Sequence, residues 1–84
     1  MKLMLSADGD VMLYRVNKEI INNFDELLNQ FYKWKKTKCY NEQLFVKFLQ
    51  DKFGNEAIEF IENLGWLDNN NLPTEYKNIK WYNF

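Results

Sequence analysis

The chain has 84 residues, of which 46% are hydrophobic and 27% are charged, a balance typical of a folded globular domain and not of a disordered segment. Its 11 basic and 12 acidic side chains give a net charge of −1, which excludes a strongly cationic nucleic-acid binder and a strongly anionic nucleic-acid mimic. The length leaves room for one hydrophobic core, so we expect residues 1–84 to form a single small globular domain.

The first predicted element is a β-hairpin made of residues 2–6 and 11–16. Both runs are apolar and suit β-strands, and the Asp8-Gly9 pair between them favours a two-residue type I′ turn, in which both central residues have positive φ. Such a turn places large apolar side chains opposite each other on one buried face, Leu5 with Met12 and Leu3 with Tyr14. The other face carries Met4 and Leu13, so we expect a further segment to cover it.

Residues 17–34 show the clearest helical periodicity of the chain. One face of the predicted helix is apolar and the opposite face is polar. The apolar positions are Ile20, Ile21, Phe24, Leu27, Leu28, Phe31 and Trp34. Asn17 has the side chain of a helix N-cap, so we expect one amphipathic helix of about five turns that lies across the hairpin.

Two shorter helices are expected next. The first begins after Asn41 and ends near Phe53, because Gly54 suits the left-handed position that follows a helix C-terminus. The second begins after Asn55 and places four apolar side chains on one face: Ala57, Ile58, Ile61 and Leu64. Gly65 and Trp66 fit a helix ending in which Trp66 packs back near Ile61.

The C-terminal residues form an aromatic tail with two structural alternatives. Residues 68–71 are a polar, turn-forming run, after which Leu72, Tyr76 and Ile79 have helical spacing. Residues 79–84 fit either a short helix or a third strand beside the hairpin, and a two-stranded hairpin needs such support in water. The predicted fold class is therefore α+β: an N-terminal hairpin, one long amphipathic helix, two shorter helices and the aromatic tail.

The residues offer little equipment for catalysis or for metal binding. Histidine, the commonest general base near neutral pH and the commonest metal ligand, is absent. Cys39 lies near several lysines that would lower its pKa, but no base accompanies it, and an unpaired cysteine usually packs as a small hydrophobic side chain. Asp8 and Asp10 flank Gly9 without the further ligands of a calcium loop. We expect no enzyme, no cofactor and no metal.

The most unusual local feature is a basic and aromatic segment. It contains four lysines within six residues, and its candidate nucleic-acid contacts are Lys33, Trp34, Lys35, Lys36, Lys38 and Tyr40. Lysines neutralise phosphates, and aromatic rings stack on exposed bases. The alternative is that the cations simply favour a helix C-terminus, where the helix dipole is negative. Because the net charge is −1, nucleic-acid binding is the second hypothesis for this chain.

Two other features favour protein binding. Residues 41–68 carry six acidic and two basic side chains, a local charge of −4, and present Glu56, Glu59 and Glu62 on the predicted third helix. The tail supplies aromatic side chains of the kind found at interface hot spots: Tyr76, Trp81, Tyr82 and Phe84, with Tyr14 and Tyr40 behind them. The alternative for the tail is that it closes over the core.

Residues 1–10, 62–68 and 72–77 resemble short uncharacterised proteins from AT-rich bacterial genomes and their phages. The resemblance implies a small inhibitor that binds and blocks a host protein such as a defence nuclease, as anti-CRISPR proteins do. An oligomeric module, including a homodimer paired through edge strands or the tail, is a further alternative. No apolar run approaches the roughly 20 residues that cross a bilayer, and Ser6 ends the first one too early for a signal peptide, so we expect a cytoplasmic protein without membrane contact.

Overall fold

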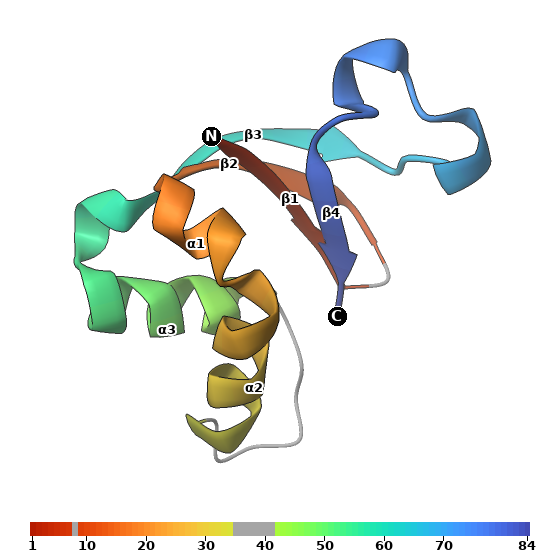
Figure 1. The fold of residues 1–84 in the computed structure, drawn as a ribbon. Coiled ribbons are helices and arrows are strands. Elements are labelled where there is room, and N and C mark those ends of the chain that lie inside the picture. The colour runs from red at the N-terminus through yellow and green to blue at the C-terminus, as the bar shows by residue number, and fades with distance from the viewer. Residues whose placement is uncertain (8, 35–41) are drawn as a thin grey trace.

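In the computed structural model, the described residues are 1–7, 9–34 and 42–84, and they form a four-stranded sheet with α-helices on one face (Figure 1). The strands are β1 (Lys2–Ser6), β2 (Val11–Val16), β3 (Ile58–Gly65) and β4 (Lys80–Asn83). The α-helices are α1 (Lys18–Asn22), α2 (Phe24–Trp34) and α3 (Glu42–Phe53). Three short 3₁₀ turns complete the elements: η1 (Asn55–Ala57), η2 (Asn69–Asn71) and η3 (Thr74–Tyr76). The α+β class is confirmed.

The predicted hairpin is present with the predicted register. β1 and β2 are antiparallel, and the opposed pairs include Leu5 with Met12 and Leu3 with Tyr14. Asp8 lies outside the described residues, so the turn type stays a prediction. The alternating apolar side chains and a short connection therefore set the pairing of the first two strands.

The sheet has the order β3-β2-β1-β4, and the C-terminal residues form one of its outer strands. β4 runs parallel to β1, which confirms the extended alternative for the tail. Buried Ser6 fastens β4 in place: its hydroxyl donates to the Asn83 side-chain oxygen at 2.9 Å and accepts from the Trp81 indole N–H at 3.0 Å. A parallel pair far apart in sequence is thus held by side-chain as well as backbone hydrogen bonds.

The main core lies between the sheet and the helices. Phe31 of α2 meets Phe45 of α3 edge to face at 5.2 Å between ring centroids, and both side chains are fully buried. Leu3, Leu5 and Tyr14 face this layer from the sheet, as the hairpin register predicts. Aromatic rings bury large areas, so this cluster supplies much of the apolar burial of a small domain.

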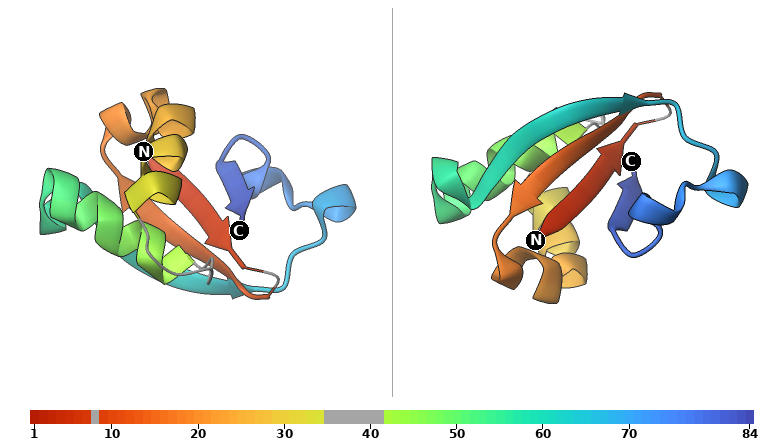
Figure 2. Two further views of the ribbon diagram at one scale, coloured as in Figure 1. Left: turned by 90° about the horizontal axis from the view of Figure 1, so that it is seen from below. Right: turned by 90° about the horizontal axis from the view of Figure 1, so that it is seen from above.

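The opposite face of the sheet is also covered, as expected from its apolar side chains. A second buried cluster contains Met4, Val11 and Leu13. Leu67, Tyr76 and Ile79 of the segment between β3 and β4 pack against it, together with Leu64 of β3 and Trp81 of β4. This segment lies at the end of the molecule away from α3, as both views in Figure 2 show.

The long helix predicted over residues 17–34 is two helices. Asn23 interrupts it with φ −115° and ψ 24°, and both its backbone N–H and its side-chain amide donate to the Glu19 carbonyl. Asparagine side chains compete for backbone groups in this way, which favours a helix break over a continuous helix. Asn17 precedes α1 in an extended conformation as expected of an N-cap, but its side chain makes no capping hydrogen bond.

The next helix is confirmed by α3, and Gly54 follows it with φ +100°. The helix predicted after Asn55 is wrong: η1 and the strand β3 occupy its residues. Two register shifts against β2 mark bulges in β3, and each bulge adds one residue to the strand. Apolar side chains in a bulged strand then recur every third residue, which imitates the spacing of a helix.

The predicted packing of Trp66 on Ile61 is also wrong. Gly65 does have positive φ, +71°, but it ends a strand and not a helix. The Trp66 side chain is 74% exposed and Ile61 is 44% exposed, so both stand at the surface.

Candidate protein-binding surface

β3 is an outer strand of the sheet, and its middle is open to solvent. Residues 59–63 are all exposed, and the large side chains among them include Phe60, 59% exposed, and Ile61, 44% exposed. No strand of the described residues pairs with the outer edge of β3. Folded proteins usually protect such edges or use them to bind, because unpaired backbone groups are a template for another chain.

The hydrogen bonds of Val16 show which way the backbone of β3 faces. Val16 exchanges both backbone hydrogen bonds with Met1, at 2.7 and 3.0 Å, so its N–H and C=O point toward β1. These groups alternate in direction along a strand, so Tyr14 also faces β1. Phe60 is the partner of Tyr14 in β3. The two therefore form a pair without hydrogen bonds between them, and the N–H and C=O of Phe60 point away from the sheet.

The same alternation turns the backbone of Ile58 outward. Ile58, however, is only 1% exposed, whereas Phe60 is largely exposed. The accessible part of the edge therefore begins at Phe60 and continues toward the bulge that follows it.

A groove lies beside this edge, between the sheet and α3. Its volume is about 440 Å³, and its lining residues are Met12, Tyr14, Glu42, Gln43, Val46, Lys47, Gln50, Phe60 and Asn63. The ring of Phe60 meets that of Tyr14 edge to face at 5.8 Å, so Phe60 forms an exposed wall against a buried floor. Burial, and secondarily the nearby Glu42 carboxylate, raises the pKa of the Tyr14 hydroxyl above its usual value, so this hydroxyl stays protonated to a higher pH than that of a free tyrosine.

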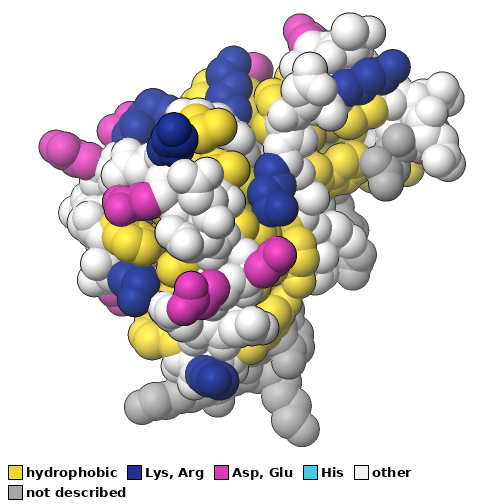
Figure 3. Space-filling view, in the orientation of Figure 1, with side chains coloured by type: hydrophobic (Ala, Val, Ile, Leu, Met, Phe, Trp, Pro, Cys, Tyr) yellow, Lys and Arg dark blue, Asp and Glu magenta, His cyan; other side chains and the backbone are white. Residues whose placement is uncertain are grey.

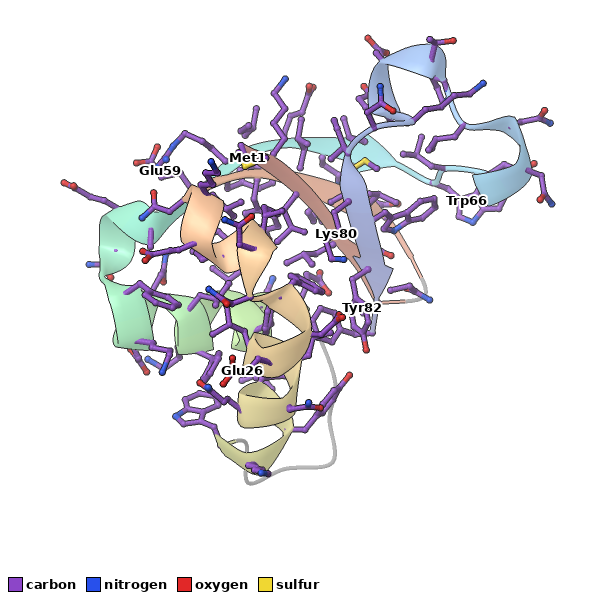
Figure 4. The ribbon with its side chains drawn as sticks, viewed as in Figure 1. Met1, Glu26, Glu59, Trp66, Lys80 and Tyr82 are labelled. Carbon is purple, nitrogen blue, oxygen red and sulfur yellow. The ribbon has the colours of Figure 1, made fainter. Side chains whose placement is uncertain are left out.

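The three glutamates predicted as partner contacts lie along this edge and not on a helix. Glu56 is in η1, and Glu59 and Glu62 are in β3. Glu59 forms an ion pair with Arg15 at 3.1 Å, and the Arg15 guanidinium also donates to the Glu56 carbonyl. In Figure 4, Glu59 and Trp66 mark the two ends of the strand, with Glu59 on the side of α3 and η1.

Glu62 lies farther along β3 on the same face as Glu59, near the segment that covers the second cluster. The pKa of the Tyr76 hydroxyl is raised, first by burial and then by the negative charges of Glu75 and Glu62. None of the ion pairs among the described residues involves Glu62. β3 itself contains two glutamates and no cation, so the edge is locally acidic.

The aromatic tail is mostly used for packing. Tyr82 and Phe84 pack on the main core, where Phe84 meets Phe45 at 5.4 Å and Tyr82 meets Phe24 at 5.7 Å. Trp81 and Tyr76 pack on the second cluster. The tail therefore closes over both faces of the sheet, and a contact of these side chains with a partner stays a prediction.

The basic segment is described only at its start. Lys33 and Trp34 form the last turn of α2, and the Trp34 ring packs on Phe31 and Phe48 at 6.2 and 5.5 Å. Lys35, Lys36, Lys38, Cys39 and Tyr40 lie outside the described residues, so the nucleic-acid surface stays a prediction. On the face drawn in Figure 3, acidic and basic side chains are interspersed.

The sequence did not identify Phe60, Ile61 or Trp66 as candidate partner contacts. Phe60 and Ile61 are the exposed large hydrophobic side chains of β3, and Trp66 follows the strand. The sequence pattern assigned all three to a helix or to its packed end, where they would be partly buried. The available signal was the run of β-compatible residues between two glycines, Gly54 and Gly65, which also suits a strand.

Comparison of the chain with known protein families, curated proteins and solved structures finds no match. Within the described part of the chain, no three or more acidic, cysteine or histidine side chains gather closely enough to hold a metal ion. Nor does any helix in these residues have the length and apolar character needed to cross a membrane.

Proposed function

We propose that this protein is a non-catalytic protein-binding module, and that its binding surface is the open edge of β3 with the adjoining groove. The observation that carries the proposal is Phe60: an aromatic side chain, 59% exposed, stands on an unpaired strand edge beside a groove of about 440 Å³. A large exposed aromatic side chain next to a concave surface is the usual anchor of a protein interface.

The resemblance to short phage and bacterial proteins suggests the kind of partner. On that basis we propose a cytoplasmic inhibitor of phage or mobile-element origin that covers a functional surface of a host protein, such as a defence nuclease. The acidic charge along β3 supports this choice, because complementary charge speeds association with a basic surface of a nucleic-acid enzyme.

The test is a comparison of two variants that each remove one exposed aromatic ring. Wild type, Phe60→Ser and Trp66→Ser are immobilised, and proteins retained from a lysate of the host bacterium are identified by mass spectrometry. Trp66 is a matched control because it is 74% exposed and does not line the groove. We expect a protein that wild type and Trp66→Ser retain and that Phe60→Ser loses.

Two results would contradict the proposal. Equal retention by Phe60→Ser, with its fold verified by circular dichroism, would place the interface elsewhere. Retention of single-stranded nucleic acid in place of protein, with affinity that falls steeply with salt, would favour the basic segment instead.

A further inference from the structure

The edge of β3 also indicates what kind of partner segment binds it. We infer that this segment is an extended peptide that adds to β3 at Phe60, inserts an apolar side chain into the groove beside α3 and presents Lys or Arg to the acidic face of the strand. The inference rests on the proposed function and specifies the chemistry of the partner.

The backbone of Phe60 is oriented to pair with an added strand. The N–H and C=O of Phe60 point outward from an exposed position, as the hydrogen bonds of Val16 establish. An extended chain alongside β3 can replace water at both groups with its own C=O and N–H, as in strand addition. The register shift that follows Phe60 interrupts regular pairing, so the added strand is short.

The groove beside Phe60 can accept a side chain of the added strand. Side chains of neighbouring strands project from the same face at paired positions, so a residue opposite Phe60 projects on the groove side. There it meets the Phe60 ring, Val46 of α3 and the floor formed by Met12 and Tyr14. The volume of about 440 Å³ accepts a large aliphatic or aromatic side chain.

The negative charge of β3 favours basic residues in the added strand. Successive residues of a strand point to opposite faces, so the partner residues on either side of the inserted one project on the face of Glu59. Arg15 partly neutralises Glu59 at 3.1 Å, whereas no ion pair among the described residues neutralises Glu62. Lysine or arginine at those partner positions would complete the pairing, and an acidic residue there would be repelled.

The same charges argue against a second copy of this chain as the occupant. Antiparallel pairing of two β3 strands about Phe60 would bring two copies of Glu59 and two of Glu62 together along one short interface. Like charges brought together across an interface disfavour association, even where none lies directly opposite another. A basic partner segment is therefore favoured over a homodimer.

Selection from a random peptide library tests the chemistry. Displayed peptides of about seven residues, long enough to pass the exposed stretch of β3, are selected on wild type and counter-selected on Phe60→Ser. We expect enriched sequences in which apolar residues alternate with Lys or Arg. Enrichment of acidic peptides, of peptides with helical apolar spacing, or of no sequence at all would overturn the inference.

Backbone methylation of the best enriched peptide then tests the mode of binding. N-methyl groups on one alternating set of residues remove the N–H groups that face β3, and the same groups on the other set leave them intact. We expect one set to weaken binding at least about tenfold and the other to change it little, because only alternate amides of an added strand face its neighbour. Equal effects of both sets would overturn strand addition.

Two further outcomes separate the inference from the proposed function. Loss of the lysate partner with Phe60→Ser, together with peptides that show no alternation, would overturn the strand inference and leave the binding surface supported. A self-association that sedimentation detects in wild type and not in Phe60→Ser would overturn it in favour of a homodimer.

Discussion

The two outer strands of the sheet are built differently. β4 has four residues, and its aromatic side chains pack into clusters on both faces of the sheet. β3 has eight residues, and those from 59 to 63 are exposed. One edge is fastened by the core and by buried Ser6, whereas the other keeps a large aromatic ring at the surface. The difference indicates that β4 stabilises the fold, whereas the middle of β3 stays accessible to solvent.

The largest effect is expected from removing an aromatic ring at the β4 end. Phe84 packs against Phe45 at 5.4 Å and Tyr82 at 4.8 Å, so Phe84→Ala leaves a gap in the main core. Because Phe84 is only partly buried, we expect the free energy of unfolding to fall by about 2–3 kcal/mol, at or below the lower end for loss of a fully buried phenylalanine ring. Urea titration followed by circular dichroism measures it. A fall of less than about 1 kcal/mol would show that the tail only rests on the core.

A smaller effect is expected from the hydroxyl that fastens β4 to β1. Ser6→Ala leaves the indole N–H of Trp81 and the side-chain oxygen of Asn83 without this partner. We expect a loss of about 1–2 kcal/mol, since unmade hydrogen bonds in a buried place are costly. A double-mutant cycle with Trp81→Phe checks the cause, because the two losses share one hydrogen bond and must be less than additive. Additive losses would contradict it.

The sequence was sufficient to predict the parts of this comparison that depend on local chemistry. Alternating apolar residues around a two-residue turn determine the pairing of β1 and β2, and α3 ends before Gly54, where a left-handed residue is needed. The position of β4 depends instead on contacts across most of the chain, such as Ser6 with Trp81, which no local pattern encodes. For that reason the sequence left two alternatives open for residues 79–84, a third strand and a short helix.

The candidate surface was predicted in part. Glu56, Glu59 and Glu62 were selected by charge, which does not depend on the secondary structure around them. Phe60 was missed because bulges gave its strand the apolar spacing of a helix. Only the pairing with β2 distinguishes a bulged strand from a helix here. The aromatic tail was selected by composition, although composition does not separate rings that pack in a core from rings that remain exposed.

Tyr14, in the groove beside β3, makes the stability of the fold depend on pH. Burial and Glu42 raise the pKa of Tyr14 in the folded state, so unfolded chains lose this proton at lower pH than folded ones. The stability linked to Tyr14 is therefore fully present below the usual tyrosine pKa of 10.0 and is lost as pH rises above it. We therefore expect a lower free energy of unfolding above about pH 10 than near neutral pH. Tyr14→Phe should show a smaller fall in the same urea titrations, and an equal fall would assign the effect to other groups such as Tyr76.

The smallest change in stability is expected at the β3 edge. Phe60→Ala removes an aromatic ring, as Phe84→Ala does, but this ring is 59% exposed and its aromatic contact is with Tyr14 at 5.8 Å. Little apolar area returns to water, so we expect a loss of less than about 1 kcal/mol in the same urea titration. A loss equal to that of Phe84→Ala would mean that the ring belongs to the core. The Phe60 ring would then be required for folding, and its exposure would no longer support β3 as a binding surface.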